Sequence, residues 1–191
     1  SGDNGADGPW EFALLADGVT ADKLYPLDLD RAYRSLDKIK PHIRKWWKVG
    51  SEAQQLFHDN VAHIGENFEG RAIAMQDEGK PIELIWNQGK LAWNYWAIPK
   101  GAPNAENAKK FIAFAIRGEQ QAILARRTGT APSNTRALQH MAEADAKKLA
   151  TYPANRAKLF ETGADWYAEV GPDGRSNIER LAESWQEWIL K

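Results

Sequence analysis

The sequence predicts an α/β protein with many helices and a small number of short, buried strands. Apolar residues recur at helical spacing near both ends of the chain and after Asn104, whereas short apolar runs without that spacing lie between residues 61 and 98. The length of 191 residues corresponds to one or two domains. The predicted strands are few for that length, so we expect an incomplete sheet.

The first sixty residues predict several helices, each bounded by a residue that starts or stops a helix. Pro9 suits the first turn of a helix, and Gly18 suits the position after its end. Pro41 closes the second helix, and Ser51 and Gln54 have the spacing of a capping box. The predicted helices cover residues 9–17, 30–40 and 42–49, and a further one begins at residue 51.

The middle of the chain changes from helical spacing to short apolar runs. We expect strands over residues 61–64, 81–86 and 91–98, the last of them ended by Pro99. Residues 91–98 (LAWNYWAI) are aromatic and apolar almost throughout, so we expect them to form a buried strand.

From Asn104 onward the sequence is helical again. Asn104 suits the N-cap of a helix with an apolar stripe, and Gly118 suits its end. The last helix has the clearest pattern, because Ser176 and Glu179 form a capping box before a face that carries Trp185. Shorter helices are predicted over residues 119–127, 134–141 and 155–163.

Composition excludes several classes of function. The chain has 25 basic and 26 acidic residues, a formal charge of -1, so no basic field favours nucleic acid. The absence of cysteine excludes disulfides, thiol catalysis and cysteine-based zinc sites. Charges interrupt every apolar run before it reaches the length of a membrane span. Nine tryptophans are many for this length, which suits both a large core and a cleft where rings stack on a ligand.

The sequence offers little for catalysis. His58 and His63 are five residues apart, which is not the spacing that points two imidazoles at one metal from a helix. Glu66 and Glu69 could act as an acid and a base, but no nucleophile accompanies them. We therefore predict no enzyme activity, no catalytic residue, no metal and no cofactor.

Three segments are more typical of binding than of chemistry. Residues 5–9 place glycines before a helix start, where free N–H groups attract anions, although a flexible tail would look the same. Residues 67–71 (NFEGR) combine an aromatic ring, a glycine and an arginine that could grip a carboxylate, or form an ordinary turn. Residues 93–96 (WNYW) place Asn94 among aromatic residues that could equally be core.

Several motifs together resemble one protein family. The resemblance rests on residues 16–19 (ADGV), 24–28 (LYPLD), 39–47 (IKPHIRKWW), 68–71 (FEGR) and 93–104 (WNYWAIPKGAPN). These segments are similar to those of bacterial extracellular solute-binding proteins of ABC importers, in the spermidine/putrescine-binding-like group. The resemblance extends from about Trp10 to the C-terminus.

The resemblance implies a periplasmic binding protein of type II fold, in which two α/β lobes close on a small ligand and deliver it to the membrane permease. Such proteins are about twice as long as this chain. The resemblance therefore implies an incomplete two-lobe architecture without its N-terminal segment and signal peptide. Residues 1–90 would form most of the C-terminal lobe, and residues 91–191 the returning part of the N-terminal lobe with the C-terminal helices.

The family's ligand positions can be transferred where the motifs match. Its stacking aromatic falls on Phe68, the arginine of some members on Arg71, and the strand carboxylate of polyamine binders on Asn94. The remaining expected ligand contacts lie near the opening helix, in a loop and late in the chain: Asp7, Trp10, Thr130 and Tyr167.

The departures from the family favour an anionic group on the ligand. Polyamines need carboxylates around their amines, and Asn94 cannot form an ion pair. Arg71 and a bare helix start instead favour a carboxylate. We expect a small amino-acid-like or carboxylate-bearing ligand, with a polyamine as the alternative, and an enzyme or a helical interaction module as less favoured readings.

An incomplete sheet has a consequence for association. Without neighbours, residues 91–98 would expose an apolar strand edge that invites pairing with another chain. We therefore expect either a swapped or associated dimer, or a separately retained N-terminal fragment.

Overall fold

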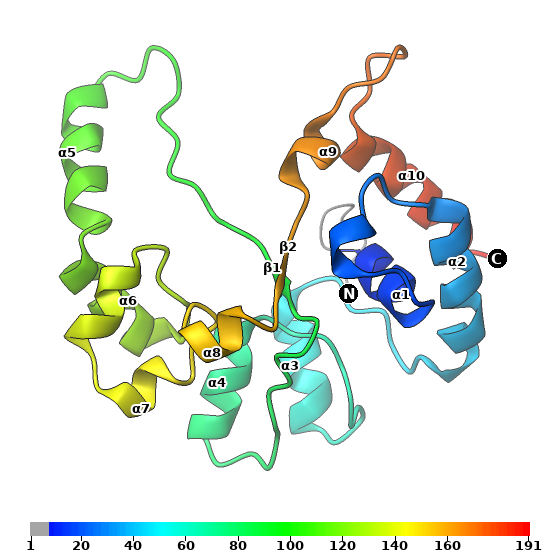
Figure 1. Ribbon diagram of the computed structural model, residues 1–191, viewed down its shortest axis with the longest axis horizontal. Helices are drawn as coiled ribbons and strands as arrows, with labels where there is room; N and C mark the ends of the chain where they lie inside the picture. Colours follow the sequence, from blue (N-terminus) through cyan, green and yellow to red (C-terminus); the bar gives the residue numbers. More distant parts are fainter. Residues whose placement is uncertain (1–7) are drawn as a thin grey trace. The chain divides into compact units, whose positions relative to one another are not determined.

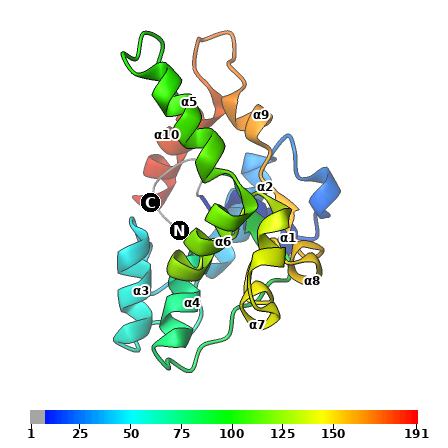
Figure 2. The same cartoon turned by 90° about the vertical axis from the view of Figure 1, so that its left-hand side faces the viewer.

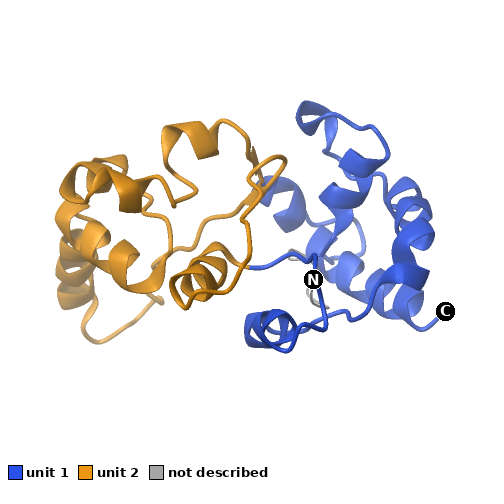
Figure 3. Cartoon of the chain, turned by 90° about the horizontal axis from the view of Figure 1, so that it is seen from below, with its two compact units in different colours: residues 1–67, 162–191 blue, residues 68–161 orange. Residues whose placement is uncertain are grey.

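The chain forms two compact units (Figure 3). The computed structural model describes residues 8–191, so Asp7 lies outside the described residues. Unit 1 comprises residues 1–67 and 162–191, and unit 2 comprises residues 68–161. The expected division after Lys90 refers to the lobes of a longer protein and stays a prediction, because the compact units of this chain have other boundaries.

Both units are mainly helical (Figure 1). The elements of unit 1 are α1 (Trp10–Ala16), η2 (Ala21–Lys23), α2 (Leu29–Ile39), η3 (Lys40–His42), α3 (Gly50–His58), α9 (Ala164–Ala168) and α10 (Asn177–Ile189). The elements of unit 2 are α4 (Glu69–Asp77), β1 (Lys90–Leu91), α5 (Ala105–Ala115), α6 (Gly118–Thr128), η4 (Thr135–His140), α7 (Glu143–Ala146), α8 (Pro153–Arg156) and β2 (Phe160–Glu161).

Tryptophans form much of the core of unit 1. Trp185 of α10 packs against Trp10 of α1, Trp46 and Trp188, with ring centroids 5.4, 5.1 and 5.1 Å away. The indole of Trp188 also donates a hydrogen bond of 2.8 Å to the carboxylate of Asp37, which joins α10 to α2 (Figure 1). Aromatic packing therefore holds the beginning and the end of the chain together.

Helix α10 confirms the sequence prediction in detail. Its N-cap is Ser176, whose backbone N–H donates to the Glu179 carboxylate at 2.7 Å in a complete capping box. Leu181, Trp185 and Trp188 are its buried face. Helices were also predicted correctly at α1 and α2, whose ends lie within two residues of the expected ones.

Unit 2 has a small apolar core beside a two-stranded parallel sheet. Ile73 of α4, Ala125 of α6 and Leu149 form the buried centre. The strands β1 and β2 pair with Lys90 opposite Phe160 and Leu91 opposite Glu161. They are the only strands in the described part of the chain, so the expected shortage of sheet is confirmed.

Three predicted strands are wrong. Residues 61–64 and 81–86 form no strand, and of residues 91–98 only Leu91 belongs to one. The remainder of that segment leads to α5 as an irregular chain (Figures 1 and 2). Tyr95 within it is 79% exposed. The apolar composition of residues 91–98 predicts burial only where a neighbouring strand covers them. In the described chain no strand pairs with this segment beyond Leu91.

Several helix boundaries also differ from the prediction. Residues 42–49 form no α-helix, because Pro41 is accommodated in the short η3 and the chain is extended at Ile43. Helix α3 begins at Gly50, so the predicted capping position at Ser51 lies inside the helix. Gly118 starts α6 instead of ending the helix before it.

Candidate ligand-binding site

The predicted site segment forms the beginning of α4. Phe68 is the N-cap residue of this helix, with an extended backbone and no side-chain cap, and its ring is 50% exposed. Arg71 lies in the first turn, where its backbone N–H donates to the Phe68 carbonyl at 3.0 Å. Phe68 and Arg71 are therefore held next to each other by the helix start itself.

Two glycines bring a loop of unit 2 against this helix start. A Cβ at Gly70 would lie 2.4 Å from the Thr128 carbonyl oxygen and 3.3 Å from the Thr130 hydroxyl, so only glycine allows this approach. Gly129 has a φ of +67°, which glycine adopts without strain, and its own Cβ would lie 3.0 Å from the Gly70 Cα. As a result, the Thr130 hydroxyl lies beside Gly70, which shares the first turn of α4 with Arg71.

Glu69 fixes two loops to the helix start. Its carboxylate accepts hydrogen bonds from the backbone N–H groups of Ala131, at 3.3 Å, and Ala150, at 2.7 Å. Burial raises the pKa of this carboxyl, while the two N–H groups act in the opposite direction. Glu69 is thus a structural clamp, a role that the sequence did not reveal because both donors are backbone groups distant along the chain.

Asn94 does not occupy the buried strand in which its role was predicted. It is exposed and lies in the irregular segment after β1, between Trp93 and Tyr95. The expected burial of residues 91–98 is therefore wrong at Asn94. Its proposed contact with a ligand stays a prediction.

Trp10 and Tyr167 belong to unit 1 and are buried there. Trp10 is 1% exposed in the tryptophan cluster. The Tyr167 hydroxyl donates to the Glu11 carboxylate at 2.7 Å, and the Tyr25 hydroxyl donates to the same oxygen at 2.5 Å. Burial and the nearby Glu11 charge raise the pKa of both tyrosines well above the ordinary value of 10.0. The role of Glu11 is not visible in the sequence, since a single glutamate in a helix is normally exposed.

The start of α4 can hold a carboxylate on a short carbon chain. The partial positive charge of the helix end favours an anion, and the Arg71 guanidinium can bind a carboxylate bidentately. The exposed Phe68 ring offers a face for the carbon chain. Residues 8–191 contain no cluster of side chains that could hold a metal ion and no helix that could cross a membrane.

Comparison with protein families gives a match over most of the chain. Residues 3–157 match the family model described as bacterial extracellular solute-binding protein. The chain is 31% identical over 192 residues to the gamma-aminobutyric acid-binding protein of Pseudomonas aeruginosa, covering 98% of this chain and 52% of that protein. It is 25% identical over 164 residues to the spermidine/putrescine-binding periplasmic protein of Escherichia coli, covering 85% and 46%.

Solved structures give the same result. The Atu4243-GABA receptor superposes with a TM-score of 0.87 at 37% identity, covering 98% of this chain and 56% of that one. An Agrobacterium tumefaciens periplasmic binding protein in complex with agropinic acid superposes with a TM-score of 0.79 at 34% identity, covering 95% and 55%.

These matches confirm the expected family, its fold and its periplasmic location, and the named relatives are binding proteins and not enzymes. The chain spans about half the length of the curated relatives it matches.

Proposed function

Because the chain belongs to the family of bacterial extracellular solute-binding proteins, we propose that it contributes to the capture of a small polar solute for an ABC importer. In this proposal, ligand contacts from two lobes favour a closed state, and the membrane permease recognises that state. No covalent step and no cofactor take part.

We propose an amino-acid-like or otherwise carboxylate-bearing ligand. The observation that carries this proposal is the juxtaposition of Arg71, the exposed Phe68 ring and the uncapped start of α4. Arg71 would bind the carboxylate, and Phe68 would stack on the carbon chain. The names of two relatives, which refer to gamma-aminobutyric acid, support the same ligand class.

A polyamine is the second candidate, supported by the similarity to the spermidine/putrescine-binding protein of Escherichia coli. An amine without a neighbouring carboxylate is costly to desolvate. In the α4 region the carboxylate of Glu69 already accepts two backbone hydrogen bonds, and Asn94 carries no charge. These features favour the carboxylate-bearing ligand over the polyamine.

The test is Arg71→Ala in the full-length protein, with gamma-aminobutyric acid and putrescine as probes in calorimetric titrations. We expect gamma-aminobutyric acid to bind at least about tenfold more weakly to this variant, a loss of about 1.4 kcal/mol, because its carboxylate loses the guanidinium. Arg127→Ala is the matched control, because Arg127 is an exposed arginine of α6 in the same unit.

Affinity within about twofold of the wild-type value would contradict the proposed carboxylate contact. Tighter binding of putrescine than of gamma-aminobutyric acid to the wild-type protein would favour the polyamine candidate instead.

We also propose that an apolar surface of unit 2 is covered in the functional protein, by a second copy or by an N-terminal segment. Helix α5 has no buried residue, although its sequence is apolar on one side, and Phe111 is 53% exposed. The Trp96 ring packs edge-on against Phe111, with centroids 5.3 Å apart, and both rings are exposed. Contiguous exposed apolar patches on soluble proteins are typical of interaction surfaces, whereas single exposed apolar residues are common everywhere.

This second proposal is tested by size-exclusion chromatography with light scattering. We expect light scattering to give the 191-residue chain alone a molar mass above the monomer value of 21.4 kDa. A stable monomer at that mass over a range of concentrations would contradict coverage by a second copy.

A further inference from the structure

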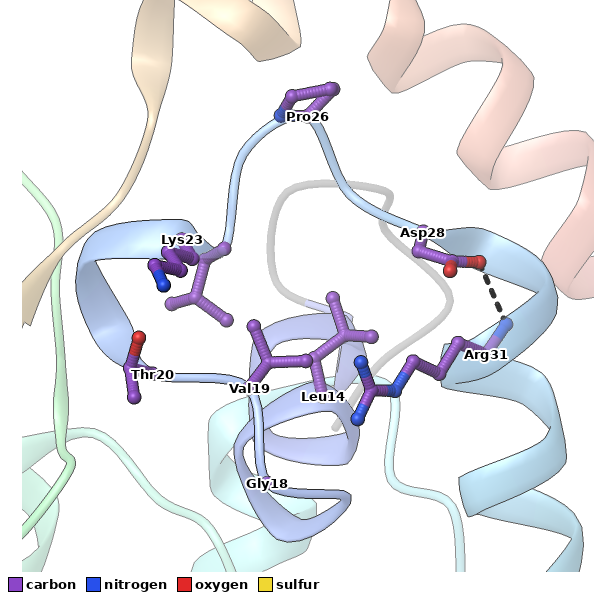
Figure 4. A pocket seen from close by; sticks show the side chains of 9 residues that line it. Leu14, Gly18, Val19, Thr20, Lys23, Pro26, Asp28 and Arg31 are labelled. Atoms are coloured by element: carbon purple, nitrogen blue, oxygen red, sulfur yellow. Dashed lines mark hydrogen bonds between the residues drawn. The ribbon is translucent and has the colours of Figure 1, made fainter.

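A cavity of about 320 Å³ lies in unit 1 where α1 turns into α2 (Figure 4). Its volume is at the lower end of the range for small-molecule sites. The buried side chains of Leu14 and Leu24 contribute apolar surface to it. Lys23 on η2 and Arg31 on α2 lie on opposite sides of the cavity in Figure 4, so its lining combines apolar side chains with two cationic residues.

Lys23 has an ammonium group that is available for a ligand. It is exposed on η2, and although its backbone N–H donates to the Thr20 carbonyl at 2.9 Å, its side chain forms no hydrogen bond or ion pair with any residue among 8–191 and has only a longer-range attraction to Asp22. Asp22 is itself hydrogen bonded to the Thr20 side chain. Lys23 therefore keeps all three of its donors.

Arg31 is oriented toward the cavity by its contacts with Asp17. Its Nε donates to the Asp17 carboxylate at 2.7 Å, and its Nη2 donates to the Asp17 carbonyl at 2.7 Å. Nη1 makes no hydrogen bond within the described chain. Lys38 also binds the Asp17 carboxylate, at 2.9 Å, so this one anion is shared by two cations. Hydrogen bonds from Arg31 and then from Lys38 lower the pKa of Asp17 to about 2.

We propose that this cavity binds a carboxylate carried on a short apolar chain. The carboxylate lies between Lys23 and the free Nη1 of Arg31, and the carbon chain lies against Leu14 and Leu24. Lysine and arginine are the side chains that bind carboxylates by charge-assisted hydrogen bonds, and the fixed guanidinium loses little freedom on binding. None of these residues belongs to the site at the start of α4.

Asp28 limits the ligand to a single charge. It lies on the rim of the cavity and accepts a hydrogen bond from the Arg31 backbone N–H at 3.0 Å, which caps α2. Its negative charge opposes a second carboxylate on the ligand. The same chemistry is offered by a free monocarboxylic acid and by a glutamate side chain of a partner protein.

The test uses butyrate and a blocked glutamate, N-acetyl-glutamate amide, as probes of the 191-residue chain by NMR. We expect saturable shifts of the backbone amides of residues 18–20 and 28–31, with a dissociation constant of about 1 mM for butyrate. Lys23→Gln should weaken binding about tenfold. It should leave the fold intact because the Lys23 side chain forms no hydrogen bond or ion pair within residues 8–191, and the backbone bond to Thr20 does not depend on the side chain. Arg34→Gln, an exposed arginine of α2 outside the cavity, is the matched control.

Tighter binding of butyrate points to a free acid, and tighter binding of the blocked glutamate points to a protein partner. Both results support a carboxylate site. Shifts that do not saturate, that are equal in Lys23→Gln and the wild type, or that are reduced as much by Arg34→Gln overturn the proposal. Butylamine is the charge-reversed probe, and equal binding of butylamine would also overturn it.

Discussion

Trp185→Ala is expected to lower the free energy of unfolding of unit 1 by about 4 kcal/mol, the typical cost of removing a buried tryptophan. Trp185 is 2% exposed and contacts rings from α1, from the segment before α3 and from its own helix. Its edge-on contacts with Trp10 and Trp46 stabilise unit 1 beyond the contribution of the apolar area that Trp185 buries. The substitution therefore removes the residue that joins three parts of the core.

Urea unfolding followed by circular dichroism and by tryptophan fluorescence measures this effect. Leu190→Ala is the control, because Leu190 follows the same helix and is 86% exposed, and its loss should change stability by less than about 0.5 kcal/mol. A loss below about 1 kcal/mol for Trp185→Ala would show that the tryptophan cluster does not carry the stability of unit 1.

Sequence patterns predicted elements whose partners are local. The capping box of Ser176 and Glu179 and the apolar face of α10 depend on residues three or four apart, and both are present. The same reasoning failed for residues 91–98, because apolar composition predicts burial only when another strand is available to cover it. Short-range rules therefore identified helices better than sheet.

The candidate site was predictable only in its residue types. The FEGR segment was recognised as a place where an aromatic ring and an arginine meet. Thr130, which the family resemblance had also named, lies beside this segment because Gly70 and Gly129 approach each other closely. The clamp at Glu69 was not predictable, because its donors are backbone N–H groups 62 and 81 residues away. Such long-range contacts leave no periodic signal in the sequence.

Glu11→Ala is expected to destabilise unit 1 by about 3 kcal/mol, since hydrogen bonds to a charged group and the loss of a buried acceptor are both costly. Glu11 is fully buried and accepts from the hydroxyls of Tyr25 and Tyr167. Without it, the buried Tyr167 hydroxyl loses its acceptor. Glu11→Gln keeps an acceptor oxygen and should cost less, which separates the hydrogen bonds from the charge.

The raised pKa values of Tyr25 and Tyr167 give this prediction a pH dependence. The unfolded chain releases the tyrosine protons as the pH passes the ordinary value of 10.0, whereas the folded chain retains them. The unfolded state then binds fewer protons than the folded state, so the stability of unit 1 should fall as the pH rises above about 10. Ion pairs raise the pKa values of Lys147 and Lys148 above the ordinary value of 10.5, so these lysines also contribute to the pH dependence in this region, and the effect of Glu11 must be measured by comparing variants.

The decisive measurement is the slope of stability against pH between about 9 and 11 for the wild type, Glu11→Gln and Tyr25→Phe. We expect a shallower slope in both variants, because Glu11→Gln removes the negative charge and Tyr25→Phe removes one of the titrating hydroxyls. Equal slopes in all three proteins would mean that the Glu11 carboxylate does not hold the tyrosine protons.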